Sequence, residues 1–170
     1  MSAESIRYRP ALEADLGAMA LVMERANAFR DGQPLPTCIE NESVVDDLRT
    51  RMHKEGAWTN VAADHDRIAG FMSGYPYSEG ENAPVDRTKE YLSLLMIEPD
   101  YWGRGIASRL LDIAASRARQ AEKQQLLLWT RANENARARS VYEHKGYVAT
   151  GRTRVSQHGY GLQVQYAVDL

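Results

Sequence analysis

The sequence predicts one α/β (α+β) domain over residues 1–170, in which helices cover a mixed sheet. Residues 11–29 and 104–121 carry apolar side chains three or four positions apart, which is typical of amphipathic helices. The run Tyr91–Ile97 is apolar at almost every position and is bounded by Pro99, as expected of a central strand buried on both faces. A chain of 170 residues, 44% of them hydrophobic, has the length and composition of one domain with its own core.

The first half of the chain is predicted to place two helices before a hairpin. A short strand at residues 6–8 stops at Pro10, and glycine and proline at residues 31–36 break the helix at 11–29. A second helix is expected at 43–54, closed by Gly56. The strand-like runs 58–63 and 68–75 flank a polar turn, which predicts a hairpin. The polar stretch 76–90 is expected to be an exposed loop.

The second half begins with the central strand at 91–97. The helix at 104–121 places its apolar side chains on one face. A strand at 125–130 and a helix at 135–144 follow, and Gly146 stands where a helix C-terminus favours glycine. The runs 147–155 and 162–168 are expected to form an antiparallel pair that closes the chain.

Charge and composition exclude several classes of protein. Lys and Arg total 21 and Asp and Glu total 23, so the net charge of −2 provides no basic field for nucleic acid. The longest apolar run, Tyr91–Ile97, is far shorter than the roughly 18 residues of a membrane span. Residues 1–4 lack the features of a signal peptide, and a single cysteine, Cys38, suits a reducing, cytoplasmic location. The four histidines are scattered, so no metal site is expected.

A turn with two glycines, Gly103 and Gly105, joins the central strand to the following helix. Glycines let backbone N–H groups converge, and the helix N-terminus adds its positive dipole end, so the turn suits a phosphate. The dinucleotide fingerprint is not met, because Ser108 stands where its third glycine belongs, and the Gly-Lys-Ser/Thr of the P-loop is absent. Taken alone, the turn is equally compatible with a purely structural role.

A second cluster makes the turn more informative. Asn135, Ala138 and Tyr142 share one face of the predicted helix. Together the two segments resemble the GNAT N-acetyltransferase superfamily, over most of the chain from Ile6 to about Tyr147. Gly105 and Ala107 match the family's Gln/Arg-x-x-Gly-x-Gly/Ala pattern, with Trp102 at its first position. The family's second block, Asn-x-x-Ala-x-x-Leu-Tyr-Glu-x-x-Gly-Phe, is matched at residues 135, 138, 142, 143 and 146, with Val141 for Leu and Tyr147 for Phe.

The resemblance implies a GNAT fold, with a mixed, mostly antiparallel sheet, a splayed parallel pair (94–97 and 126–130) and helices on both faces. It also implies transfer of an acetyl group from acetyl-CoA to a primary amine, by direct attack in a ternary complex. The residues implied to bind acetyl-CoA are Leu95, Met96 and Ile97 for the pantetheine arm, Gly103, Arg104, Gly105, Ile106 and Ala107 for the pyrophosphate, and Trp102, Ser108 and Asn135 beside them.

The chemistry of the reaction identifies further candidates. Tyr142, with an ordinary pKa of about 10, is predicted to protonate the departing thiolate, and a backbone N–H near Met96 or Ile97 to stabilise the oxyanion. The general base is left open between Glu90, Glu98 and a water relayed by Tyr91 and Ser93.

The acceptor is expected to be a small-molecule or peptide amine. The resemblance implies an acceptor site built from residues 29–42, 75–90 and 157–161. Loop carboxylates there suit a cationic amine: Asp31, Glu40, Glu42, Glu79, Glu81 and Asp86. The alternation at 163–168 predicts a sheet edge and a homodimer through it. The competing hypotheses are a non-catalytic acyl-CoA-binding regulatory domain on the same fold and a domain that binds another nucleotide.

Overall fold

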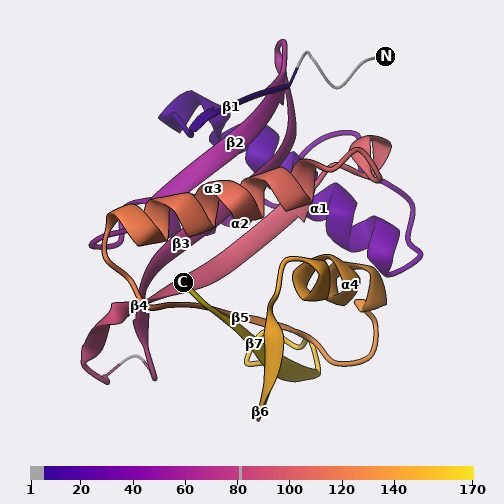
Figure 1. Cartoon of the computed structure of the whole chain (residues 1–170). Helices are drawn as coiled ribbons and strands as arrows, with labels where there is room; N and C mark the ends of the chain where they lie inside the picture. Colours follow the sequence, from indigo (N-terminus) through magenta and orange to yellow (C-terminus); the bar gives the residue numbers. More distant parts are fainter. Residues whose placement is uncertain (1–5, 81) are drawn as a thin grey trace. The chain divides into compact units, whose positions relative to one another are not determined.

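The computed structural model describes residues 6–80 and 82–170 (Figure 1). Residues 1–4 and Glu81, which bear on the signal peptide and on the loop carboxylates, lie outside these ranges. The described elements are β1 (Ile6–Pro10), α1 (Leu16–Arg30), α2 (Ser43–Met52), β2 (Trp58–Asp64), β3 (Arg67–Ser78), β4 (Val85–Ile97), α3 (Ile106–Gln120), β5 (Gln125–Arg131), α4 (Ala136–His144), β6 (Val148–Val155) and β7 (Leu162–Asp169), with short 3-10 turns at Glu13–Asp15 and Pro99–Tyr101. Hydrogen bonds join the strands of these ranges in the order β1-β2-β3-β4-β5-β7-β6, which confirms a mixed α/β sheet. No helix in the described ranges is long and apolar enough to cross a membrane.

The chain forms two compact units, and each is discontinuous in sequence. The first unit contains the residues up to Tyr75 together with Leu94–Leu110, and the second contains Pro76–Ser93 and Leu111–Leu170. Strand β4 and helix α3 each pass from one unit to the other. The single domain over residues 1–170 stays a prediction.

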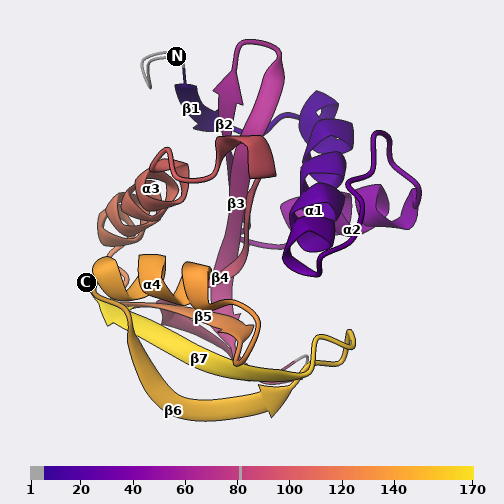
Figure 2. The same ribbon diagram turned by 90° about the vertical axis from the view of Figure 1, so that its right-hand side faces the viewer.

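The core of the first unit lies between its helices and its antiparallel strands. Helices α1 and α2 lie on one side of β2 and β3 (Figure 2). Met19 and Ala20 of α1 pack with Val61 of β2 and Phe71 of β3, and all four side chains are fully buried. Because α1 buries one stripe of side chains spaced three and four apart, the predicted amphipathic pattern is confirmed.

The second unit is built around β7. Strand β5 pairs with β4 in parallel, through Lys89–Leu92 and Gln125–Leu128 only, although β4 continues to Ile97 and β5 to Arg131. On its other side β5 pairs with β7 along its whole length, and β7 pairs with β6. The edge strand is therefore β6, whose residues are all exposed, and not β7, whose alternation had predicted an edge.

Three predicted elements differ from the structure in their bounds or burial. The expected loop at 76–90 is largely strand, because β3 runs on to Ser78 and β4 begins at Val85. The first α-helix begins at Leu16, because the Asp15 carboxylate accepts a hydrogen bond from the Leu12 N–H at 2.7 Å and fixes a 3-10 turn before it. The last residues of β4, 94–97, are half-buried and not buried on both faces.

Candidate functional site

The turn before α3, in the first unit, exposes unpaired backbone amides. Gly103 and Gly105 adopt φ values of 81° and 76°, which side chains with a Cβ avoid. The Arg109 N–H donates to the Gly105 carbonyl at 3.0 Å, so the helical ladder starts there and the amides of residues 106–108 have no partner within the helix. A Cβ on Gly105 would meet no protein atom within 4 Å, so the space beside the turn is open. The geometry suits an anion such as a phosphate.

Trp102 stabilises this turn through contacts within the first unit. Its indole Nε1 donates to the Ile97 carbonyl at 2.8 Å, and its backbone N–H donates to the Pro99 carbonyl at 3.1 Å. Its ring centre lies 4.7 Å from that of Phe29, in an edge-to-face arrangement. Both N–H groups of Trp102 are thus used inside the unit, and they are not available to a phosphate. The exposed Arg104 donates to the Asp100 carbonyl at 3.1 Å, and its guanidinium lies 4.8 Å from the Tyr101 ring, which keeps its charge beside the turn.

The end of β4 lies close to β3. A Cβ on Gly70 of β3 would come within 2.9 Å of the Met96 carbonyl and 2.7 Å of the Ile97 side chain, so only glycine permits this approach. The side chains of Leu94 and Met96 pack against the core of the first unit. Leu95 and Ile97 are half-buried and alternate with them along the strand.

Glu98, one of the candidate bases, is held in a buried ion pair. Glu98 is 4% exposed, and its carboxylate accepts two hydrogen bonds from Nε of Arg25, at 2.8 and 3.0 Å. Arg25 also donates to the Pro36 carbonyl at 3.0 Å. This ion pair joins the turn to α1.

Glu90, the other carboxylate candidate, lies in the second unit. It is 5% exposed, and its carboxylate lies 3.5 Å from the Lys123 ammonium. Glu90 is thus also paired with a cation. Tyr91 and Ser93, the proposed relay, are half-buried on β4 beside the last paired residue, Leu92.

Asn135 and Tyr142 lie in the second unit. Tyr142 is part of α4, and Asn135 directly precedes this helix. The Asn135 carbonyl accepts the first helical hydrogen bond, and its side-chain amide donates to the Thr130 hydroxyl at 2.9 Å. No described residue donates to the Asn135 Oδ1 atom, which can therefore accept a hydrogen bond from a ligand. Both residues are where the helical periodicity had predicted them.

The Tyr142 side chain is buried among aromatic rings. Its ring centre lies 6.0 Å from that of Tyr147 and 6.3 Å from that of Tyr166. Burial, followed by the nearby Tyr91 phenol, raises the pKa of Tyr142 to about 12. The phenol therefore stays protonated throughout the physiological pH range, as a proton donor must.

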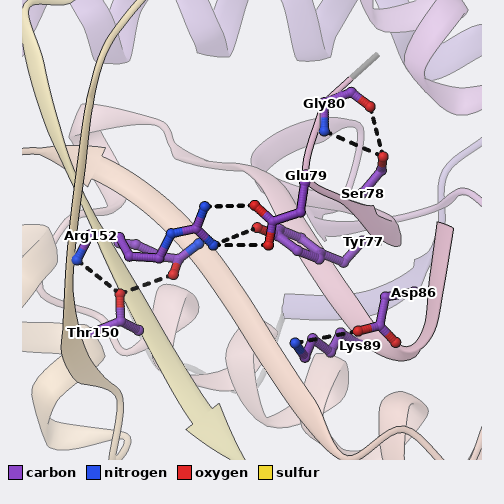
Figure 3. Close-up of polar contacts among 9 residues, drawn as sticks. Tyr77, Ser78, Glu79, Gly80, Asp86, Lys89, Thr150 and Arg152 are labelled. Atoms are coloured by element: carbon purple, nitrogen blue, oxygen red, sulfur yellow. Dashed lines mark hydrogen bonds and ion pairs between the residues drawn. The ribbon is translucent and has the colours of Figure 1, made fainter. Parts of the chain in front are cut away.

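Two of the loop carboxylates expected to attract a cationic amine, Glu79 and Asp86, have partners of their own. Arg152 of β6 donates to both oxygens of Glu79, at 3.0 and 2.6 Å (Figure 3). These hydrogen bonds lower the pKa of the Glu79 carboxyl. The hydrogen bonds from Thr88 lower the pKa of Asp86, which also lies 3.3 Å from the Lys89 ammonium. Neither carboxylate is left to bind a cationic amine.

The sequence analysis missed the aromatic and basic residues on the opposite side of β5. Trp129 alternates with Thr130 and therefore points to the face that α4 does not contact. The guanidinium carbons of Arg152 and Arg154 lie 6.0 and 4.4 Å from the centre of its ring. Arg152 and Arg154 are two positions apart in the sequence, and so are Trp129 and Arg131, which places each pair on one face of its strand. This spacing could have indicated the face.

The predicted site residues thus fall into two groups. Residues 95–97 and 102–108 lie together in the first unit, whereas Asn135 and Tyr142 belong to the second. In the described ranges, no group of three or more His, Cys, Asp or Glu side chains is arranged to hold a metal ion.

Comparison with known proteins identifies the family. The chain belongs to the acetyltransferase (GNAT) family, whose profile matches residues 24–147. Solved structures share its fold: the ribosomal-protein-S18-alanine N-acetyltransferase of Escherichia coli is 19% identical with a TM-score of 0.72, over 96% of this chain and 93% of that chain. A Salmonella typhimurium protein, whose structure contains its cofactor acetyl-CoA, is 16% identical with a TM-score of 0.73, over 98% of this chain and 94% of that chain. An acetyltransferase from Thermus thermophilus is 20% identical with a TM-score of 0.71, over the full length of both chains. No curated protein matches the sequence.

Proposed function

We propose that this protein is a single-domain enzyme that transfers an acetyl group from acetyl-CoA to a primary amine, by direct attack in a ternary complex. The observation that carries the proposal is the turn before α3, where two left-handed glycines precede a helix whose first amides lack partners. The pyrophosphate of acetyl-CoA has the charge and the acceptor oxygens that such a turn binds.

The remaining contacts of acetyl-CoA follow from this position. The amides of residues 103–107 bind the pyrophosphate, and the Ser108 hydroxyl adds a further donor at the same helix end. The backbone of Leu95, Met96 and Ile97 pairs with the amide groups of the pantetheine arm, since β4 continues beyond its last pair with β5 at Leu92. Asn135 offers its Oδ1 atom to the same arm. Trp102 stabilises the turn through its hydrogen bonds to the Ile97 and Pro99 carbonyls.

The reaction needs few groups from the protein. The neutral amine attacks the thioester carbon, and a backbone N–H near Met96 or Ile97 stabilises the oxyanion. The C–S bond then breaks, the thiolate takes the phenolic proton of Tyr142, and the amine releases its extra proton to water. We assign the path of that second proton to a water beside Tyr91 and Ser93, because Glu90 and Glu98 are held in ion pairs.

Two measurements test this function. We expect acetyl-CoA to raise the melting temperature of the protein, because a ligand that binds only the folded state stabilises it, while ATP and NAD leave it unchanged. We expect free CoA thiol to appear only when a suitable amine from an acceptor panel is present. Stabilisation by acetyl-CoA without thiol release with any amine would favour the non-catalytic regulatory domain.

We further propose that the protein is a cytoplasmic homodimer that pairs through the edge of β6. The location is supported by its only cysteine, Cys38, which is free and exposed. The edge is supported by the exposure of its apolar side chains, with Val148 68% and Val155 75% exposed. Light scattering at micromolar concentration should give twice the 19.1 kDa of one chain. A species of 19.1 kDa alone would contradict the dimer.

A further inference from the structure

The face of the β5-β7-β6 sheet opposite α4 carries arginine and aromatic side chains. We call it the basic face and define it by Tyr91, Trp129, Arg131, Arg152 and Arg154. Contacts of α4 lie on the opposite face, because Asn135 bonds to Thr130, the neighbour of Trp129 in β5. Helix α4 therefore does not cover the basic face, on which Arg152 and Arg154 are exposed.

Most of the positive charge at this face is neutralised within the protein. The cations beside it that have a carboxylate partner are Lys89 with Asp86 at 3.3 Å, Arg131 with Glu134 at 3.0 Å and Arg152 with Glu79 at 2.6 Å. Figure 3 shows the Arg152 guanidinium and the Glu79 carboxylate facing each other as a two-bonded pair. Arg152 is thereby fixed beside Tyr77, whose hydroxyl accepts a hydrogen bond from it at 3.2 Å.

Arg154 is different, because no carboxylate of the described residues lies within ion-pair distance of it. Its Nε donates to the Gln163 side chain at 2.8 Å, and its guanidinium lies over the Trp129 ring at 4.4 Å. These neutral partners fix the position of the guanidinium and leave its charge unmatched. A guanidinium held in this way is prepared for an anionic ligand, above all for a carboxylate that can accept two parallel hydrogen bonds.

Arg154 also lies near β4, at the part of this strand that belongs to the second unit. Its Nη2 atom is 3.5 Å from the Tyr91 hydroxyl. Tyr91 precedes Leu92, the last residue of β4 that pairs with β5. A small molecule whose carboxylate binds Arg154 therefore lies beside Tyr91, one of the two residues proposed to hold the water that takes the proton of the amine.

We propose that Arg154 binds a carboxylate of the acetyl acceptor, so that the acceptor is a small amine that also carries a carboxylate, such as an amino acid. This inference rests on the proposed acetyltransferase function and specifies its substrate class. It adds a carboxylate to the amine that the sequence predicted, and two of the loop carboxylates expected to attract that amine, Glu79 and Asp86, are already paired.

The test compares acids with their neutral amides. The rate of CoA release is measured for α- and ω-amino acids and for the corresponding amino amides, which keep the amine and lose the negative charge. We expect kcat/KM to favour the acids by about 10- to 100-fold, the usual size of a hydrogen bond between two charged groups. Arg154→Gln should abolish this preference, mainly through a higher KM for the acids, and leave the amides within about twofold.

Two further variants separate recognition from a loss of structure. Arg154→Lys keeps the charge without the planar fork and should retain part of the preference. Arg119→Gln removes an exposed arginine of α3, away from the basic face, and should leave the preference unchanged. A structural defect would lower the rates for acids and amides alike.

The outcomes also separate the two proposals. Acetylation of acids and amides at equal rates, or an equal loss for both in Arg154→Gln, would overturn the carboxylate inference and leave the acetyltransferase function intact. Release of no CoA with any amine would count against the acetyltransferase function itself. In that case, calorimetric titration of N-acetyl amino acids into the CoA-saturated protein still tests Arg154, because binding that Arg154→Gln does not weaken would overturn its role.

Discussion

Replacing Tyr142 with phenylalanine should slow the chemical step by roughly 10²- to 10⁴-fold, the usual contribution of general acid catalysis. The change keeps the ring and its packing against Tyr147 and Tyr166 and removes only the hydroxyl. The affinity for acetyl-CoA should therefore change little. Single-turnover rates are the proper measurement, because product release can mask a change in chemistry under steady-state conditions.

The neighbouring Tyr147 provides a matched control for this experiment. Its hydroxyl is buried and has no hydrogen-bond partner among the described residues, so Tyr147→Phe makes the same chemical change at a nearby position. We expect that variant to keep wild-type single-turnover rates. If Tyr142→Phe did so as well, the thiolate would leave unassisted or would take its proton from water.

The pH dependence of the reaction follows from the buried position of Tyr142. If the Tyr142 phenol kept its ordinary pKa, activity would be lost near pH 10. Burial, however, raises the pKa of this phenol to about 12. The protonated form is the active one, and a raised pKa keeps the phenol protonated to higher pH. A rate profile corrected for acceptor ionisation should thus show no loss from this group below about pH 11, in contrast to the value near 10 expected from the sequence.

Replacing Gly105 with valine should weaken acetyl-CoA binding by about 100-fold or more. The new Cβ would project into the open space beside the turn, where no protein atom lies within 4 Å and where the pyrophosphate is proposed to bind. Loss of two hydrogen bonds to a charged group, at about 1.5–3 kcal/mol each, accounts for that factor. Calorimetric titration with acetyl-CoA measures it directly.

Gly32 serves as the control for backbone strain. It also has a positive φ, of 67°, and a Cβ there would also meet no atom within 4 Å, but it follows α1 and is not part of the turn. Gly32→Val should therefore cost stability of a similar size, about 1–2 kcal/mol, without weakening acetyl-CoA binding. An unchanged affinity in folded Gly105→Val would contradict the proposed phosphate site.

The sequence predicted the order of elements and the residues of the turn, because both depend on local patterns. The spacing of Gly103, Gly105 and the helix after them is a local signal, and so is the shared face of Asn135 and Tyr142. The partners of ionised side chains were not predicted from the sequence. Glu98 pairs with Arg25, 73 residues away in sequence, and Glu79 pairs with Arg152, also 73 residues away. Such pairs depend on the tertiary fold, so the base and the acceptor charge were predicted incompletely.

Strand β4 illustrates the same limit. Its apolar composition at residues 91–97 predicted burial on both faces, yet residues 94–97 are half-buried. The pairing with β5 stops at Leu92, and the hydrophobic pattern of one strand contains no information on where a neighbouring strand ends its pairing. The exposed strand segment at 85–89 was missed for the opposite reason, because its polar residues resemble those of a loop.

The hydrogen bonds of Arg25 have a consequence for the order in which the protein folds. This one guanidinium joins α1 to the Pro36 carbonyl and to Glu98, at sequence separations of 11 and 73 residues. The longer closure requires the greater loss of chain entropy, so it forms after local structure in α1 is established. We therefore expect the turn that follows Glu98 to reach its final shape late in folding, so that the proposed phosphate site forms only after α1 has docked.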